Sequence, residues 1–327
     1  MQTPPASPQQ KRLLGQFFTV ANPFQCDLFF QWKALVLSSL SPDEKILEPF
    51  AGAKNILQLT RDAGIKRDWA CFDICPPPDC TGVIQQDTLE HFPTGHAVAI
   101  TNPPYLAKNS ATRRGLPFPE TSHEDLYQVA LEKMLASCRF VAAIIPASFL
   151  TQNIMQERLL GVSVLTCRMF EDTDCPVCLA LFAPDSRPDF PVYRENEFLG
   201  NFHELEGKLP APRAVIPWTF NAPTGEIGLR AIDNSRAASI EFVAGAEISP
   251  DSVLSSSRSI TRIKFPGSLG PRKISRIIAG ANKLLNTYRA QTHDILMTPF
   301  KGLRADGNFR RRLDFDKARQ ILNLSLA

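Results

Sequence analysis

Four short apolar runs in the first hundred residues constrain the fold most strongly, because small, acidic or amide residues follow each of them. The runs span 45–48, 69–72, 82–85 and 97–101, and a helical spacing of apolar residues over 55–59 follows the first one. Strands that alternate with helices are typical of a parallel sheet. Ligands bind beyond the carboxyl ends of such strands. The sequence therefore predicts an α/β domain whose functional residues follow its strands.

The fourth run leads directly into Asn102, Pro103, Pro104 and Tyr105. Two consecutive prolines fix the backbone and remove two N–H donors, which leaves carbonyl groups pointing outward. The Asn102 side-chain oxygen and such a carbonyl can together accept the two hydrogens of an exocyclic NH2 group, and the Tyr105 ring can stack on the heterocycle that carries it. Asn-Pro is also a common turn dipeptide, so the motif taken alone is equally compatible with an ordinary turn.

The other three strand ends are suited to a ligand that contains a nucleoside. Residues 49–53 are small and precede a helix, so the backbone can approach a ligand closely and offer it unpaired N–H groups. Asp73 closes the second run about twenty residues later, which is the spacing at which an acid reaches ribose hydroxyls in nucleotide-binding βαβ units. Asp87 follows the third run and can accept from an adenine amino group. The order of these residues predicts a cofactor that carries a ribose.

With these motifs in this order, residues 13–184 resemble the S-adenosylmethionine-dependent amino-methyltransferases that act on adenine N6 in DNA, and within them the gamma class. The resemblance implies a doubly wound, mostly parallel methyltransferase sheet of the seven-stranded type and S-adenosylmethionine as the cofactor. The implied cofactor-binding residues are Phe18, Thr19, Glu48, Pro49, Phe50, Ala51, Gly52, Asp73, Ile74, Asp87 and Asn102.

The same resemblance implies the reaction. The segment from Asn102 to Tyr105 matches the family's catalytic tetrapeptide, with Asn102, Pro103, Pro104 and Tyr105 as the catalytic residues. Hydrogen bonds from the adenine amino group to the Asn102 side chain and the Pro103 carbonyl would draw N6 toward tetrahedral geometry. Phe170 lies in a segment similar to the one that supplies an aromatic face, so Tyr105 and Phe170 would sandwich a flipped base.

Two positions depart from the family pattern. Lys54 stands where the family usually has a second glycine in the cofactor loop, and Val20 stands where it often has proline. A cation at a helix amino terminus is unfavourable. We expect Lys54 either to reach the carboxylate of the cofactor or to weaken its binding, and the second case would favour a protein that has lost catalysis.

The two halves of the chain have net charges of opposite sign. Residues 1–185 contain 15 Lys and Arg against 19 Asp and Glu, whereas residues 186–327 contain 21 against 14. A basic run is often only a solvated face, but behind a methyltransferase-like domain it favours contacts with DNA phosphates. The predicted DNA-binding residues are Lys108, Arg113, Arg114, Arg258, Arg262, Arg272, Lys273, Arg310, Arg311 and Arg312.

We expect three segments along the chain. Residues 1–12 are expected to be disordered, residues 13–185 to form the S-adenosylmethionine-binding catalytic domain, and residues 186–327 to form a basic α+β target-recognition domain. The segment 191–223 is rich in proline and aromatic residues and is expected to be a linker or a loop-rich module. The basic segment 108–115 is expected to be a mobile loop near the substrate.

Three helices are expected outside the motifs, over 124–135, 275–289 and 315–323. The helix over 275–289 has basic residues opposite its apolar face. It could lie along a DNA groove or pack as an ordinary amphipathic helix.

Metal binding and membrane insertion are not expected. The one close cysteine pair, Cys175 and Cys178, has no partner pair and no neighbouring histidines, and the five histidines show no ligand spacing. No apolar run reaches the roughly 18 residues that span a bilayer, and the first residues lack the basic start of a signal peptide. These features predict reduced cysteines and a cytoplasmic protein.

Together, the motifs and the basic second half predict a site-specific DNA methyltransferase that transfers a methyl group from S-adenosylmethionine to N6 of a flipped adenine. The expected setting is a restriction-modification system or another bacterial or phage DNA-modification system. Double-stranded DNA is the expected partner, a cognate restriction endonuclease is a candidate second partner, and the enzyme is expected to act as a monomer. One alternative keeps the chemistry but changes the substrate to RNA adenine or a protein glutamine. Another is a catalytically inactive DNA-binding protein.

Overall fold

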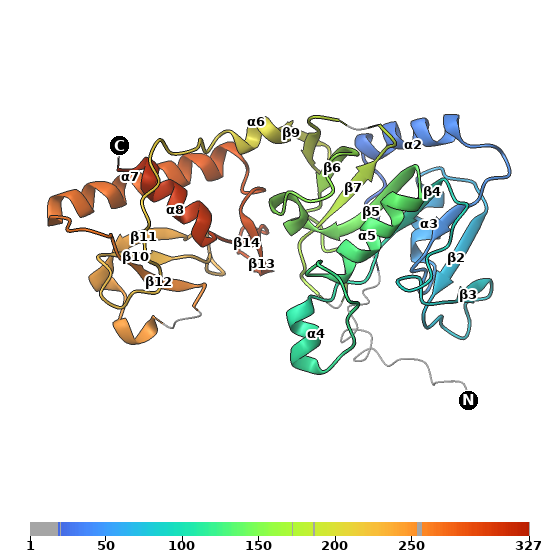
Figure 1. Ribbon diagram of the computed structural model, residues 1–327. Helices are drawn as coiled ribbons and strands as arrows, with labels where there is room; N and C mark the ends of the chain where they lie inside the picture. The colour runs from blue at the N-terminus through green and yellow to red at the C-terminus, as the bar shows by residue number, and fades with distance from the viewer. Residues whose placement is uncertain (1–18, 20, 172, 186, 254–256, 327) are drawn as a thin grey trace. The chain divides into compact units, whose positions relative to one another are not determined.

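The computed structural model describes residues 19, 21–171, 173–185, 187–253 and 257–326. The chain divides into two compact units (Figure 1). The first consists of Met1–Phe149 and Asn153–Phe198, and the second of Leu150–Gln152 and Leu199–Ala327. The division therefore falls after residue 198, thirteen residues beyond the boundary expected from composition at 185. The segment 1–12, for which disorder was expected, lies outside the described residues.

The central sheet of the first unit belongs to a nine-stranded sheet with the order β3-β2-β1-β4-β5-β7-β6-β8-β9, whose strand β9 crosses the division at residue 198. Strands β1 to β5 pair in parallel, and β7 runs antiparallel to both of its neighbours, β5 and β6. The doubly wound, mostly parallel sheet of seven strands is thus confirmed for β1 to β7. The strands are β1 Ile46–Glu48, β2 Trp69–Asp73, β3 Val83–Gln85, β4 Val98–Thr101, β5 Phe140–Pro146, β6 Leu159–Val164, β7 Val177–Phe182, β8 Pro191–Arg194 and β9 Glu197–Asn201.

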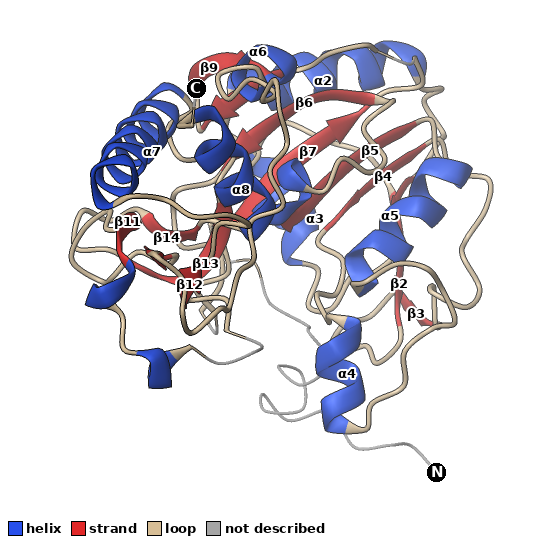
Figure 2. Ribbon diagram, turned by 60° about the vertical axis from the view of Figure 1, so that its left-hand side comes forward, coloured by secondary structure: helices blue, strands red, loops and turns tan. Residues whose placement is uncertain are grey.

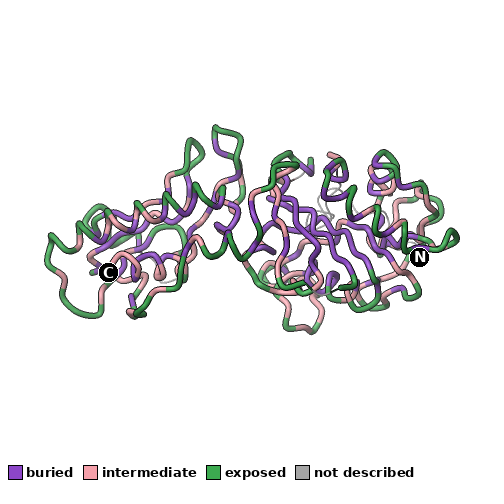
Figure 3. Tube along the Cα trace, turned by 90° about the horizontal axis from the view of Figure 1, so that it is seen from above, coloured by how far each residue is buried: buried purple, intermediate pink, exposed green. Residues whose placement is uncertain are grey.

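Helices cover both faces of this sheet, so its central strands are buried (Figures 2 and 3). Helices α2 (Asp27–Ser39) and α3 (Asn55–Asp62) share one core with alternate residues of β4 and β5. Helix α5 (Leu126–Ser137) lies on the other face and begins at a capping box made by Asp125 and Gln128. Parallel strands buried on both faces read as continuous apolar runs, which is why the sequence identified them.

Two segments of the first unit differ from the expectation. Residues 108–115 form a short helix, α4 (Lys108–Arg114), which ends at Gly115 with a left-handed φ of 63°. Residues 191–223 were expected to be irregular, but they begin with β8 and β9 and the short helix α6 (Phe202–Glu206). Strand β8 pairs with β6, some thirty residues earlier in the sequence. Such a strand depends on a distant partner, and a local pattern does not reveal it.

The second unit has the expected α+β composition. Its antiparallel sheet has the order β11-β10-β12, and β13 and β14 form a separate two-stranded hairpin. The strands are β10 Ile227–Arg230, β11 Glu241–Ala244, β12 Ile260–Ile263, β13 Thr298–Leu303 and β14 Phe309–Arg312. The helices are α7 Pro271–Gln291 and α8 Phe315–Leu324. Short 3-10 helices occur at Ala147–Thr151, Gly245–Glu247 and Pro250–Ser252.

Helix α7 corresponds to the helix expected over 275–289 and packs through its apolar face. The Asn282 side chain donates to the carbonyl oxygen of Phe242 and accepts from its N–H, at 2.7 and 2.8 Å, which fixes α7 to β11. Ile277 and Leu285 are buried, whereas Arg272, Lys273 and Arg276 on the same helix are exposed. The packing alternative therefore holds for one face, and the basic face remains available.

None of the helices in the described part of the chain is both long enough and apolar enough to cross a bilayer.

Candidate active site

A cavity of about 500 Å³ lies where β1, β2, β3 and β4 end. It brings together most of the residues that the sequence predicted for the cofactor and the catalytic motif, although they come from five separate segments. Of those residues, the cavity is lined by Thr19, Phe50, Ala51, Gly52, Asp73, Ile74, Asp87, Asn102, Pro103 and Pro104. Glu48, Pro49 and Tyr105 are not among the lining residues, and Phe18 lies outside the described residues.

Asp73 connects the small-residue loop to the end of β2. One of its carboxylate oxygens accepts from the Gly52 N–H at 2.8 Å, and the other accepts from the Cys75 N–H at 2.8 Å. Gly52 has a φ of 47°, in the left-handed region that glycine adopts without strain. Each carboxylate oxygen can accept a second hydrogen bond, so Asp73 can hold the loop and still bind a hydroxyl group in the cavity.

Glu48 lies behind the cavity, not in its wall. Its side chain is fully buried, and one carboxyl oxygen accepts from the Thr101 hydroxyl and the Phe50 N–H. The other oxygen, Oε2, has no hydrogen-bond partner among the described residues. Burial raises the pKa of Glu48 to about 8, so the carboxyl is mostly protonated at neutral pH. Glu48 therefore joins the cofactor loop to Thr101, the residue immediately before Asn102.

The buried carboxyl of Glu48 should make stability pH-dependent. Folding raises its pKa from an ordinary value of 4.5 to about 8. The protonated carboxyl therefore adds its full amount to the free energy of unfolding below about pH 4.5, and this amount is lost as the pH rises through 8. Between these two pH values the free energy of unfolding falls by about 1.4 kcal/mol per pH unit. Urea unfolding of the wild type and Glu48→Gln at pH 5.5 and pH 8 should show the variant gaining relative stability at the higher pH. An equal difference at both pH values would contradict the assignment.

Asn102 and Tyr105 contact one another directly at the end of β4. The Tyr105 hydroxyl lies 2.5 Å from Asn102 Oδ1 and 2.6 Å from the Ile144 carbonyl oxygen, and it can donate its proton to either acceptor. Burial raises the pKa of Tyr105 well above its usual range, so this hydroxyl stays a donor. Donation to Oδ1 would fix which end of the Asn102 amide is the oxygen, and an amide oxygen can accept two hydrogen bonds.

The expected sandwich of a base between Tyr105 and Phe170 is not formed in this structure. The two ring centroids are 5.9 Å apart at an interplanar angle of 72°, an edge-to-face contact. Phe170 is completely buried, within the core that α2 and α3 share with the sheet. Phe170 therefore packs against the Tyr105 ring, and the prediction that it offers a face to a base is corrected because its side chain is not exposed.

Lys54 does not point into the cavity. It has a φ of 62°, a conformation that costs a non-glycine residue of order 1 kcal/mol, and this explains the glycine that the resemblance led us to expect. Its Nζ donates to the Thr81 carbonyl oxygen. The expectation that Lys54 reaches a ligand carboxylate is therefore wrong for this conformation of the side chain.

Sequence reasoning missed one wall of the cavity, made of Pro117, Phe118 and Pro119 together with Leu89, Leu106 and Leu126. A small apolar cluster under α4 supports this wall, in which Leu106, Ala111 and Leu126 are buried and Phe118 packs against them. The signal was present in the sequence as an apolar triplet, Pro-Phe-Pro, directly after a basic segment. Prolines conceal it because they interrupt any strand or helix periodicity.

Two basic residues of α4 donate hydrogen bonds to backbone carbonyl groups, one in the following loop and one in α4 itself. Lys108 donates to the Thr121 carbonyl oxygen at 3.1 Å, and Arg113 donates to the Asn109 carbonyl oxygen at 3.2 Å. Arg113 and Arg114 are nonetheless exposed. Their exposure is compatible with the predicted phosphate contacts.

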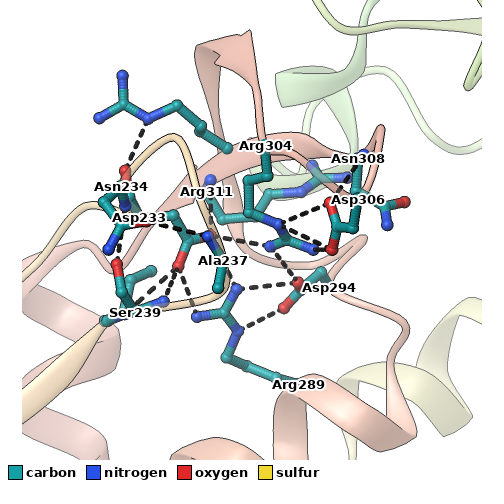
Figure 4. A network of polar contacts seen from close by, with 12 residues as sticks. Asp233, Asn234, Ala237, Ser239, Arg289, Asp294, Arg304, Asp306, Asn308 and Arg311 are labelled. Carbon is teal, nitrogen blue, oxygen red and sulfur yellow. Dashed lines mark hydrogen bonds and ion pairs between the residues drawn. The ribbon is translucent and has the colours of Figure 1, made fainter.

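The second unit separates its basic residues into buried and exposed groups. Arg258, Arg272 and Lys273 are exposed, and Arg262, Arg310 and Arg312 are partly exposed. Arg311 has only 7% of its surface exposed, and burial lowers its pKa to about 10. It belongs to a polar network around Asp233 (Figure 4). The prediction that Arg311 contacts DNA is therefore corrected, because its side chain is directed into the core.

Among the residues that the structure describes, no group of three or more His, Cys, Asp or Glu side chains is placed to hold a metal ion.

No protein-family description and no curated protein matches this sequence. Among solved structures, similarity is found to the methyltransferase subunit of a type I restriction-modification system from Streptococcus thermophilus, at 14% identity and a TM-score of 0.39, over 54% of this chain and 46% of that one. The EcoKI M protein of a type I restriction enzyme aligns at 15% identity and a TM-score of 0.35, over 78% and 68%. The type IIG restriction endonuclease BpuSI aligns at 16% identity and a TM-score of 0.38, over 56% of this chain and 28% of that one.

This chain thus spans about half or less of the S. thermophilus subunit and of BpuSI. All three TM-scores lie below 0.5 and all identities below 25%. The functional assignment therefore depends on the geometry of the cavity itself.

Proposed function

We propose that this protein is a site-specific DNA methyltransferase that transfers a methyl group from S-adenosylmethionine to N6 of adenine. One observation carries the proposal: Asn102, Pro103 and Pro104 line the same cavity as Gly52 and Asp73. An amide oxygen and backbone carbonyls suited to an exocyclic amine thus lie in one cavity with the loop and acid suited to a ribose-containing cofactor.

The cavity residues fit S-adenosylmethionine in chemical character. Asp73 would hold the ribose hydroxyls, the backbone of Ala51 and Gly52 would face the amino-acid end, and Asp87 would accept from the adenine amino group. Ile74 and the missed wall at Phe118 would cover the apolar faces of the adenine ring. When bound, the cofactor supplies an electrophilic methyl group on a positively charged sulfur.

The protein contributes mainly orientation. Asn102 Oδ1 and the Pro103 carbonyl oxygen would accept the two amino hydrogens of the target base, which would draw its nitrogen toward tetrahedral geometry. When the Tyr105 hydroxyl donates to Asn102 Oδ1, which lies 2.5 Å away, it would keep this oxygen directed toward the amino group. The nitrogen would form a bond to the methyl carbon as the carbon–sulfur bond breaks, which releases a neutral thioether and leaves a positively charged methylated amine. This acidic amine would lose one proton to solvent, so no strong base is required. Positioning and charge complementarity then supply most of the rate enhancement.

DNA is the proposed substrate because the second unit is basic. Residues 199–327 contain 19 Lys and Arg and 11 Asp and Glu, a net charge of +8. The exposed cations on α7 and the exposed Arg113 and Arg114 are suited to phosphates.

The proposed setting is a restriction-modification or related DNA-modification system, in which the enzyme acts as a monomer and a cognate nuclease is the candidate second partner. The catalytically inactive alternative is separated from this proposal by cofactor binding and transfer, because Lys54 bonds to Thr81 outside the cavity lining and does not decide between them.

The test is transfer of label from tritiated S-adenosylmethionine to unmethylated duplex DNA, in parallel with structured RNA and with cell-extract protein. We expect labelled N6-methyladenine after digestion of the DNA to nucleosides. Label in RNA adenine or in protein glutamine, with none in DNA, would transfer the assignment to the alternative substrate while keeping the site. Absence of both cofactor binding and transfer would contradict the assignment of the cavity.

A further inference from the structure

The three consecutive arginines of β14 do not share one role, because neighbouring residues of a strand point to opposite faces. Phe309, Arg311 and Leu313 are buried, whereas Arg310 and Arg312 between them are partly exposed. Arg311 is therefore directed into the unit, and Arg310 and Arg312 are directed out of it.

The guanidinium of Arg310 is held from two sides. It lies over the Phe300 ring at 5.0 Å from the ring centroid, and its Nε donates to the Asp233 carbonyl oxygen at 2.6 Å. Gly302 on the facing strand has a φ of 89°, and a Cβ atom there would lie 3.7 Å from Arg310 Cδ. The aromatic face and the carbonyl restrict the side chain before any ligand binds, which reduces the entropy lost on binding.

The carbonyl that holds Arg310 is itself on a fixed residue. The Asp233 side chain is fully buried and accepts from Arg289 at 2.8 and 2.9 Å and from Arg304 at 3.0 Å. It also accepts from the Arg311 N–H at 3.1 Å and the Ser239 N–H at 2.8 Å. Figure 4 shows these donors converging on Asp233. The position of the Asp233 carbonyl is therefore determined by a network of fixed charges.

One edge of the Arg310 guanidinium remains open. Its two Nη groups have no hydrogen-bond acceptor within the described part of the chain, in contrast to those of Arg289 and Arg304, which bind carboxylates. A planar, fixed pair of donors matches the O6 and N7 acceptors of guanine in the major groove. A phosphate contact requires no such restraint, and the unrestrained Arg272 on α7 is suited to that role.

We propose that Arg310 reads a guanine of the recognition sequence through two hydrogen bonds from its Nη groups. This inference rests on the proposed function and adds a specificity-determining residue to it. Phe300 and Asp233 are positioning residues in this assignment, because they restrain Arg310 and do not themselves contact the base. Burial and, to a smaller extent, the charge of Arg258 lower the pKa of Arg312. Both arginines would add positive charge for the neighbouring phosphates.

The test measures which duplexes the full-length protein binds from a randomised DNA library, at several salt concentrations, for the wild type, Arg310→Ala and Arg272→Ala. The wild-type motif is expected to contain a guanine whose replacement costs about 5- to 150-fold in affinity. In Arg310→Ala this preference should vanish at that position alone. Arg272→Ala should weaken all sequences equally and lower the salt slope by about 1.

A second variant distinguishes a loss of base recognition from a loss of folding. Phe300→Leu removes the ring beneath the guanidinium but leaves both Nη groups, and it should relax the same guanine position in part. If Arg310→Ala instead weakens every duplex equally and lowers the salt slope, Arg310 contacts phosphate and the proposal is overturned. If the wild type binds no duplex and methylates none, the proposed function fails, and the role of Arg310 fails with it.

Discussion

Replacing Asn102 by alanine should lower kcat for methyl transfer by about 10²- to 10³-fold, the range for removal of one hydrogen-bonding group directed at the reacting atoms. Asn102 follows β4 and lines the cavity, and its side-chain oxygen lies 2.5 Å from the Tyr105 hydroxyl. The substitution removes one of two acceptors for the amino group, while Asp73 and the loop at Gly52 keep their contacts. Binding of S-adenosylmethionine should therefore change little.

Single-turnover transfer and equilibrium binding of labelled cofactor, measured on the same preparations, check this prediction. Asn109→Ala is the matched control, because Asn109 is an exposed amide on α4. Tyr105→Phe provides a graded comparison: it keeps the ring but removes the donor that orients Asn102, so its loss of kcat should be smaller. Full activity in Asn102→Ala would mean that the reacting amine lies elsewhere. A parallel loss of cofactor binding would mean that Asn102 serves the cofactor instead of the base.

The residues around this site could be predicted to the extent that local pattern determines them. Buried parallel strands are continuous apolar runs, so β1, β2 and β4 could be recognised, and the residues after them necessarily meet at one edge of the sheet. Asp73 and Asn102 came from this reasoning. The burial of Phe170 could not be predicted in this way. It depends on packing against the strands of the sheet and on the isolated bridge to Thr19, a partner some 150 residues away.

The role of Arg311 shows a different limit. The alternation Phe309, Arg311, Leu313 placed this arginine on an apolar face, but arginine is rarely buried unless it is paired. The carboxylates that make its position tolerable, Asp233 and Asp294, lie 78 and 17 residues earlier in the sequence. The three consecutive arginines 310–312 were therefore interpreted as one surface, although one of the three, Arg311, lies inside the fold.

Replacing Asp233 by alanine should destabilise the second unit by about 3–5 kcal/mol, the cost of removing one partner from a buried ion pair. Two arginines, Arg289 and Arg304, donate to this carboxylate, and both are at least 92% buried. Without Asp233, Arg289 retains Asp294, and Arg304 retains Asp294 and Asp306, so three cations including Arg311 would share two carboxylates. The excess positive charge in the core makes the loss large.

Calorimetric unfolding of the full-length protein should show the transition of the second unit moving to lower temperature, while the transition of the first unit stays in place. Asp316→Ala is the matched control, since Asp316 is exposed on α8 and pairs with Arg319 at the surface, and it should leave both transitions nearly unchanged. Although burial alone would raise the pKa of Asp233, hydrogen bonds from Arg289 lower it below its usual range. The ionised Asp233 therefore adds its full amount to the free energy of unfolding above the pKa that Asp233 has in the unfolded chain. This amount is lost as the pH falls through the pKa that Asp233 has in the folded protein.

The difference in the free energy of unfolding between the wild type and Asp233→Ala should accordingly become smaller in acid and be constant near neutral pH. Loss of Asp233 also loosens the carbonyl that holds Arg310, so at temperatures below its transition the variant should discriminate less against duplexes that lack the guanine. A variant that is destabilised but keeps full discrimination would show that Phe300 alone suffices to hold Arg310. An unchanged transition would mean that the neighbouring carboxylates already neutralise the three arginines, and that the network is not an element of stability.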